Sequence, residues 1–359
     1  MKISDKYLFS ADDDLEMIRK TILTKKLSGT SDIIYEYEVA LKIFFGSKYA
    51  IATSSGTSAI QTALFIAGVR RGDEVILPPT CPSMTIFPIL YVGARPIFCD
   101  THVNNFGLDV EDLSKKISRK TKAIIEVPMW GYPTDVKGLS DFAKSKGIPL
   151  ILDLAQAHGT RIDGNYLSFY GDVSCFSTHD RKILSTGEGW FILTDNDQYN
   201  TEAKSFIQFG NMDGISFGLN FKLGALQASL GYNRIKYIKE QLIARETNAR
   251  HVIDGIKNKN IAELNIAKDG YPNYYSLLLN LQFKDNWAFI NFLAQNGIPS
   301  DILRYDYKAL YQYPAFKKFT VECENAEFLA GSITTIPVHP GLSKNELDYM
   351  IDLINSFKE

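Results

Sequence analysis

The stretch from Gly171 to Thr194 reads GDVSCFSTHDRKILSTGEGWFILT, and the interpretation of the whole chain starts from it. Two apolar, β-prone runs, 173–177 and 190–193, flank a loop rich in charge and glycine, with Lys182 in its middle. A lysine held between buried strands loses solvation and part of its basicity, which is what an amine nucleophile requires. The alternative is a solvated surface lysine, since Asp180 and Arg181 precede it.

Composition narrows the class of protein. The 359 residues suffice for two domains, and 45% apolar with 22% charged residues is typical of a soluble globular protein. A net charge of -2 without long Lys/Arg blocks argues against nucleic acid or an anionic membrane as partner. The five histidines show no metal-ligand spacing, so we expect no metal.

Location is predicted from the N-terminus and the cysteines. No apolar leader follows Met1, so we expect no export and a cytoplasmic protein. The four cysteines lack C-x-x-C spacing, and three lie in apolar surroundings, which predicts buried free thiols in a reducing compartment. The uncharged run 75–94 is long enough to span a bilayer, but four prolines interrupt it. We therefore expect a strand, a loop and a short buried helix there.

A strand-loop-helix alternation predicts an α/β fold. Helices are expected over 12–26 and 33–45, before strands over 49–52, 74–77, 95–99, 123–127, 149–153, 173–177 and 190–193. Helical patterns between several strands imply a mostly parallel sheet covered on both faces, with function at the carboxyl ends of its strands.

A long helix over 223–256 leads into a region of different character. The remainder alternates as strand 274–281, helix 287–296, an aromatic-rich loop 305–319, a strand near 335–337 and a helix from Lys344. This α+β pattern predicts a large domain, residues 1–245, and a smaller C-terminal domain, residues 246–359.

A small polar loop follows the first strand. Residues 53–58 read TSSGTS and open a helix expected over 59–67. Backbone N–H groups and hydroxyls at the positive end of a helix suit an anion such as phosphate. An ordinary helix N-cap is the alternative, and neither a Walker lysine nor G-x-G-x-x-G is present.

Asp153 closes an apolar strand, where an unpartnered carboxylate would be costly. Together with Lys182 and the polar loop, it matches what pyridoxal phosphate needs. The aldehyde of this cofactor takes an amine, its pyridine nitrogen takes a carboxylate, and its phosphate takes N–H and hydroxyl donors.

The chain resembles the DegT/DnrJ/EryC1/StrS family of aminotransferases, which act mainly on nucleotide-linked keto-sugars. The similarity runs from about residue 15 to the C-terminus and is carried by SSGTSA (54–59), GDEVI (72–76), GARPIFCD (93–100), TKAII (121–125), DLAQAHG (153–159), GDVSCFS (171–177), KILSTGEG (182–189), NFKL (220–223), LYQYPAF (310–316) and IPVHPGLS (336–343).

The resemblance implies a type I pyridoxal-phosphate transferase fold and a homodimer with active sites shared at the interface. By position, Lys182 would carry the cofactor, Asp153 would hold its ring nitrogen, and Gln156 would lie near its phenolic oxygen. The phosphate would be bound by Gly56, Thr57 and Ser177, and by Asn220 from the partner subunit. The expected substrates are an amino-acid donor, L-glutamate, and a keto-sugar acceptor in amino-sugar, polysaccharide or secondary-metabolite biosynthesis.

Several positions depart from the family pattern. Pro82 stands where many members place an aromatic ring, Trp190 replaces the last glycine of Gly-Glu-Gly-Gly, and Lys222 replaces the arginine of Asn-Tyr-Arg-Met. Asp306 and Tyr311 replace histidines of the small-domain loop.

Two alternatives to transamination stay open. One is a sugar dehydratase, although that branch has histidine in place of Lys182, and His179 lies nearby here. The other is a non-catalytic protein that keeps the cofactor.

Overall fold

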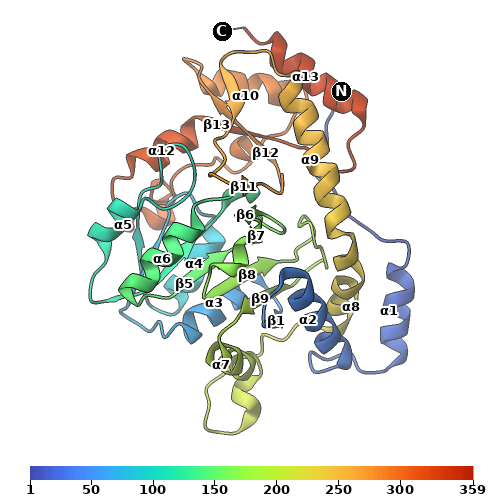
Figure 1. Ribbon diagram of the computed structural model, residues 1–359, viewed down its shortest axis with the longest axis vertical. Helices are drawn as coiled ribbons and strands as arrows, with labels where there is room; N and C mark the ends of the chain where they lie inside the picture. The colour runs from blue at the N-terminus through green and yellow to red at the C-terminus, as the bar shows by residue number, and fades with distance from the viewer. Residues whose placement is uncertain (359) are drawn as a thin grey trace.

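The computed structural model describes residues 1–358 and contains a seven-stranded sheet (Figure 1). The strand order is β1-β9-β8-β5-β4-β2-β3, and only β9 runs antiparallel to its neighbours within this sheet. The expected mostly parallel sheet is confirmed, with each strand within two residues of its expected position. The strands are β1 Tyr49–Thr53, β2 Glu74–Leu77, β3 Arg95–Phe98, β4 Thr121–Glu126, β5 Leu150–Asp153, β8 Val173–Ser177 and β9 Trp190–Thr194.

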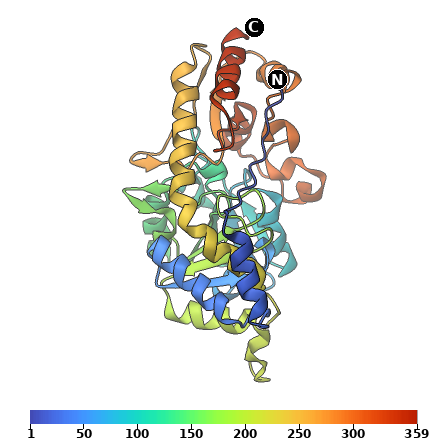
Figure 2. The same ribbon diagram turned by 90° about the vertical axis from the view of Figure 1, so that its right-hand side faces the viewer.

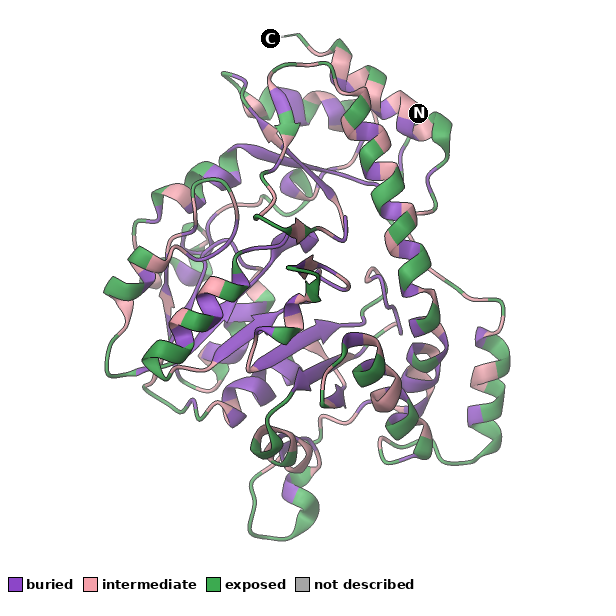
Figure 3. Ribbon diagram, viewed as in Figure 1, coloured by how far each residue is buried: buried purple, intermediate pink, exposed green. Residues whose placement is uncertain are grey.

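Helices cover both faces of this sheet, and the strand residues alternate between two apolar cores. In β2, Val75 and Leu77 face one core while Ile76 faces the other, because successive side chains of a strand point to opposite sides. Figure 3 shows the buried strands between helices with exposed outer faces. One core includes α3 Gly56–Ile66, α4 Ser83–Tyr91 and α7 Asp197–Ile207; the other includes α2 Asp32–Phe45, α5 Val110–Lys116, α6 Val136–Lys146 and α8 Ala225–Arg234.

The C-terminal part forms a smaller α+β unit around the antiparallel strands β10 Ile261–Glu263, β12 Leu277–Leu281 and β13 Ile333–Ile336. Helix α9, Ile238–Gly255, runs from the large sheet to this unit and lies against α13, Lys344–Ser356 (Figures 1 and 2). A third, small sheet joins β6 Arg161–Ile162, β7 Asn165–Tyr166 and β11 Gly270–Tyr271. The remaining helices are α1 Asp14–Leu23, α10 Asn286–Gln295, α11 Asp301–Arg304 and α12 Glu324–Gly331.

Two helix boundaries differ from expectation. Helix α3 begins at Gly56, three residues early, because Ser55 and Ser58 form a capping box that brings residues 56–58 into the first turn. The single helix expected over 223–256 is α8 and α9 joined by a short 3-10 turn, Ile235–Tyr237.

The uncharged run 75–94 forms β2, a loop and α4, as expected. No helix within residues 1–358 is long and apolar enough to cross a membrane. The thiols of Cys81, Cys99, Cys175 and Cys323 are all free and buried, which confirms the expected free thiols.

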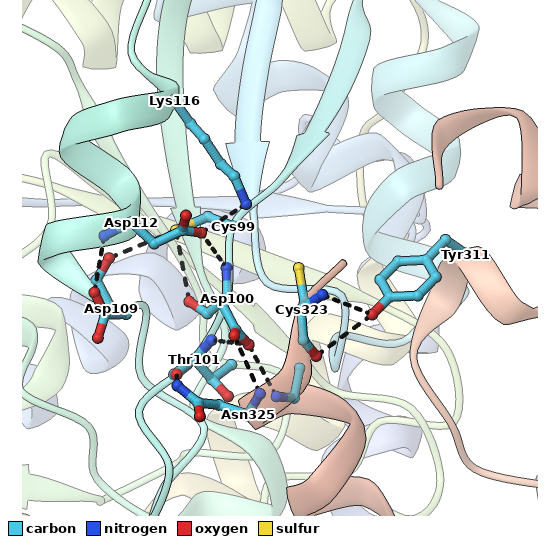
Figure 4. Close-up of polar contacts among 10 residues, drawn as sticks. Cys99, Asp100, Thr101, Asp109, Asp112, Lys116, Tyr311, Cys323 and Asn325 are labelled. Atoms are coloured by element: carbon cyan, nitrogen blue, oxygen red, sulfur yellow. Dashed lines mark hydrogen bonds and ion pairs between the residues drawn. The ribbon is translucent and has the colours of Figure 1, made fainter. Parts of the chain in front are cut away.

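Asp100, just after β3, joins the large sheet to the small unit (Figure 4). Its carboxylate accepts the backbone N–H groups of Asn325 at 3.1 Å and Ala326 at 2.9 Å, in the first turn of α12. These N–H groups have no partner within the helix, so Asp100 caps α12 from another part of the chain.

Replacing Asp100 by alanine is therefore expected to lower the free energy of unfolding by about 1–2 kcal/mol, because two N–H groups lose their acceptor. Urea unfolding measures the change. Asp141→Ala, on the exposed face of α6, is the control and is expected to stay within about 0.5 kcal/mol of the parent. Equal stability of the two variants would contradict the capping role.

Candidate active site

A cavity of about 1130 Å³ opens at the carboxyl ends of the central strands and is closed by the small unit. Its wall contains Asp153 at the end of β5, Ser177 at the end of β8, and Tyr305 and His339 from the C-terminal part. Six of the residues predicted from sequence line this one cavity, namely Gly56, Thr57, Asp153, Gln156, Ser177 and Lys182.

Lys182 lies in the loop between β8 and β9, and its Nζ is 5.0 Å from the centre of the Tyr275 ring. Within residues 1–358, no hydrogen-bond acceptor or carboxylate binds this Nζ. Burial lowers the pKa of Lys182 to about 8, and Asp153 opposes this shift. The surface alternative is therefore wrong: Lys182 is half-buried and lines the cavity.

A lowered pKa makes the neutral, nucleophilic amine predominant above about pH 8 instead of above the ordinary 10.5. The rate at which pyridoxal phosphate attaches to cofactor-free protein is thus expected to rise with pH up to about 8 and then level off. Absorbance after mixing measures this rate between pH 6 and 9.5. A rate that keeps rising to pH 9.5 would contradict a desolvated lysine.

Asp153 is 4% exposed, and both of its oxygens are held. Oδ2 accepts from Thr85 Oγ1 at 2.7 Å, and Oδ1 accepts from the Ala155 N–H at 3.2 Å. Burial raises the pKa of this carboxyl, although Thr85 opposes the shift. No cationic side chain within residues 1–358 forms an ion pair with Asp153. A positively charged group in the cavity would complete this site.

The side chain of Gln156 is held by a hydrogen bond from the loop that follows β4. Its Oε1 accepts the backbone N–H of Trp130 at 2.6 Å, and the Trp130 indole N–H donates to Asp301 at 3.0 Å. Trp130 also lines the cavity, whereas Tyr132 is buried and donates its hydroxyl to Glu263.

The polar loop supplies one end of the cavity. Gly56 and Thr57 are the first residues of α3, where backbone N–H groups point out of the helix. Position 56 must be glycine, because a Cβ there would lie 2.5 Å from Cζ2 of Trp190. The ring of Trp190, which stands where the family has a glycine, therefore fills the space that the missing side chain of Gly56 leaves free.

The structure does not bring Asn220 to this cavity. It is exposed, and its Oδ1 accepts from Lys222 Nζ at 2.6 Å. Pro82 lines the cavity as expected. Tyr311 is buried against Glu327 and Cys323 outside the cavity (Figure 4), and the exposed Asp306 pairs with Lys308.

Sequence reasoning assigned no role to several groups at this site. Thr85 bonds Asp153, Tyr275 lies beside Lys182, and Arg245 lies in the cavity wall from α9. They come from separate elements, so no local spacing could have revealed them; only the folded sheet and α9 bring them to one place.

The model of the DegT/DnrJ/EryC1/StrS aminotransferase family matches residues 10–355, and the chain belongs to this family. This membership, together with the fold, defines the class of protein, a pyridoxal-phosphate-dependent aminotransferase of fold type I.

Similar proteins cover nearly the whole chain. A GDP-perosamine synthase of Escherichia coli O157:H7 is 28% identical over 95% of this chain and 94% of its own length. A dTDP-3-amino-3,4,6-trideoxy-alpha-D-glucose transaminase of Micromonospora megalomicea subsp. nigra is 25% identical over 95% and 94%. The solved structure of sugar aminotransferase CalS13 from Micromonospora echinospora superposes with a TM-score of 0.90 over 99% of both chains at 23% identity.

Proposed function

We propose that this protein transfers the amino group of L-glutamate to a nucleotide-linked keto-sugar, with pyridoxal phosphate held on Lys182. One observation carries the proposal: an unpartnered, desolvated amine and a buried carboxylate without an ion-pair partner share one cavity. The cofactor would supply the missing partner of both groups. Its aldehyde would react with the Lys182 amine, and its ring N–H⁺ would pair with the Asp153 carboxylate. The polar start of α3 supplies donors for a phosphate.

When bound, pyridoxal phosphate supplies a carbonyl group and a ring that accepts electrons from the substrate carbon. Asp153 holds a proton on the ring nitrogen, and Thr85 and Ala155 fix the orientation of its carboxylate. The Lys182 amine, set free when the substrate's amino group takes its place on the cofactor, would take the proton from the substrate carbon that bears that amino group, and its lowered pKa suits this role. Gly56, Thr57 and Ser177 bind the phosphate.

The nucleotide-linked acceptor is inferred from the relatives. The names of the two relatives describe a GDP-linked and a dTDP-linked sugar product. The cavity of about 1130 Å³ is large enough for a sugar nucleotide, and Trp130 and Tyr305 offer rings for stacking. The same relatives support a role in amino-sugar biosynthesis, and the buried free thiols suit the cytoplasm.

A homodimer would complete the site. Asn220 is exposed, and the segment that precedes it, which projects below α7 in Figure 1, exposes four large apolar side chains: Phe209, Met212, Ile215 and Phe217. A second copy of the chain would bury this segment and bring Asn220 to the neighbouring phosphate. We also propose that residues 1–245 and 246–359 act as the two domains, with the boundary inside α9; residue 359 itself lies outside the described residues.

Ile215→Asp is expected to convert the dimer into a monomer and to weaken cofactor binding by about tenfold or more, because a buried charge opposes association. Sedimentation and absorbance titration measure the two effects. A variant that stays dimeric would place the interface elsewhere.

The function is tested by two half-reactions followed by absorbance. L-Glutamate should convert the bound cofactor to its amine form, and a nucleotide-linked keto-sugar should convert it back. Cofactor binding without any response to amino acids would favour the dehydratase or the non-catalytic alternative. His179 lines the cavity 3.9 Å from Glu188, but Lys182 is kept where that branch has histidine, and this favours amino transfer. Absence of cofactor binding would overturn the proposal.

A further inference from the structure

The segment before α1 has no helix or strand and runs from the small unit to α1 (Figure 2). Three contacts hold it: the Ile3 N–H donates to the Gly297 carbonyl at 2.9 Å, the Ser4 carbonyl lies 2.9 Å from His339 Nε2, and Tyr7 stacks on the His339 ring. These contacts place the side chains of Asp5 and Tyr7 in the cavity wall.

The Asp5 carboxylate lies between two guanidinium groups. Its Oδ2 accepts from Arg181 Nη1 at 3.3 Å and also from Arg304 Nη1. Hydrogen bonding to Arg304 lowers the pKa of Asp5 despite its partial burial, so the group is ionised near neutral pH. Arg181 immediately precedes Lys182 and lines the same cavity. Arg304 does not line the cavity, and its Nη1 also lies 3.7 Å from Asp301 Oδ1. A carboxylate of the chain therefore already pairs with an arginine in the wall of the cavity that holds the reactive amine.

A further guanidinium group in the cavity wall, that of Arg245, has no carboxylate partner within residues 1–358. Arg245 is 3% exposed and lines the cavity, where it donates only to the carbonyls of Tyr274 at 3.3 Å and Tyr275 at 3.2 Å. Within residues 1–358, its Nε has no partner and no carboxylate forms an ion pair with it. A buried guanidinium without a counter-ion is costly, and an anionic ligand entering the cavity would relieve this cost.

We propose that Arg181 in the cavity wall, with Arg304 behind it, forms a carboxylate-binding subsite for a substrate, and that Asp5 fills it until the substrate's carboxylate replaces it. The proposal deepens the function proposed above and rests on it. The carboxylate belongs either to a dicarboxylic amino donor or to an acidic sugar. Lys222, which replaces a family arginine, lacks the planar fork that Arg181 and Arg304 offer.

The test is calorimetric binding to the cofactor-loaded protein with ligands that do not react. Glutarate represents the donor. UDP-glucuronate represents an acidic sugar, and UDP-glucose is its match without a carboxylate. The variants are Asp5→Asn, Arg181→Gln and the two combined. Asp13→Asn is the matched control, because Asp13 pairs with Lys236 in the same part of the chain and does not line the cavity.

For one of the two carboxylate ligands, Arg181→Gln is expected to raise Kd about tenfold or more, since a charge-assisted bond is lost. Asp5→Asn is expected to lower the same Kd about threefold or more, because the internal competitor is gone. The double variant should bind no better than Arg181→Gln alone, and neither UDP-glucose nor Asp13→Asn should show a change. Which ligand responds identifies the source of the carboxylate.

An ion pair that merely fastens the N-terminal segment predicts a different result. Asp5→Asn would then lower thermal stability without tightening either ligand, and this outcome would overturn the proposal, as would an unchanged Kd in Arg181→Gln. The glutamate half-reaction is recorded on the same preparations. If it fails while the Kd values shift as expected, the proposed reaction is wrong and the subsite stands.

Discussion

Lys182→Ala is expected to reduce transamination by roughly 10⁴-fold or more, because the variant loses both the amine that holds the cofactor and the base that moves the substrate proton. The measurement is amino-group transfer from glutamate, with the absorbance of the bound cofactor recorded in parallel. The variant should fold normally, since no hydrogen bond to the Lys182 Nζ within residues 1–358 is lost.

Lys120→Ala is the matched control for this experiment. Lys120 is also a lysine in a turn of the large domain, but it is exposed and does not line the cavity. The cofactor of Lys120→Ala should keep its lysine-bound spectrum. Comparable spectra for Lys182→Ala and the parent protein would show that another group holds the cofactor.

Asp153→Asn is expected to lower the transamination rate by about 10²–10⁴-fold and to weaken cofactor binding, because a neutral amide cannot stabilise a proton on the ring nitrogen. Asparagine keeps the size of the side chain and can still accept from Thr85 Oγ1, so the geometry is conserved while the charge is removed. Single-turnover rates with glutamate separate this loss from weaker binding.

Thr85→Val provides the comparison for Asp153→Asn. It removes the 2.7 Å hydrogen bond but leaves the carboxylate charge, so a loss of only about tenfold is expected. If Thr85→Val were as damaging as Asp153→Asn, orientation would matter more than charge, and the proposed role of Asp153 would be wrong.

The sequence predicted the sheet well because its strands are short apolar runs bounded by polar or glycine-rich turns. The strand expected over 173–177 is observed as Val173–Ser177, and Asp153 is a candidate because a carboxylate is out of place at the end of such a strand. Lys182 could be selected only after Asp153 and the polar loop were considered with it. The helix start at Gly56 was missed because a capping box extends the helix into a loop that reads as irregular.

Contacts that join distant segments could not be read from local patterns. Asp5 meets Arg304 across 299 positions, and Thr85 meets Asp153 across 68. Only the arrangement of the sheet, α9 and the N-terminal segment decides which of many charged residues meet. The role predicted for Asn220 likewise depends on a contact that the single chain does not make, because it requires a second copy of the chain.

The four buried thiols can report which part of the protein unfolds first. Burial raises the pKa of each thiol, so none is poised to react with an alkylating reagent while its layer stays closed. Cys81 is in the cavity wall, Cys175 is in the centre of the sheet, and Cys323 is beside the Asp100 contact. The order in which mass spectrometry finds them alkylated in rising urea would therefore show whether the cavity, the small unit or the sheet gives way first.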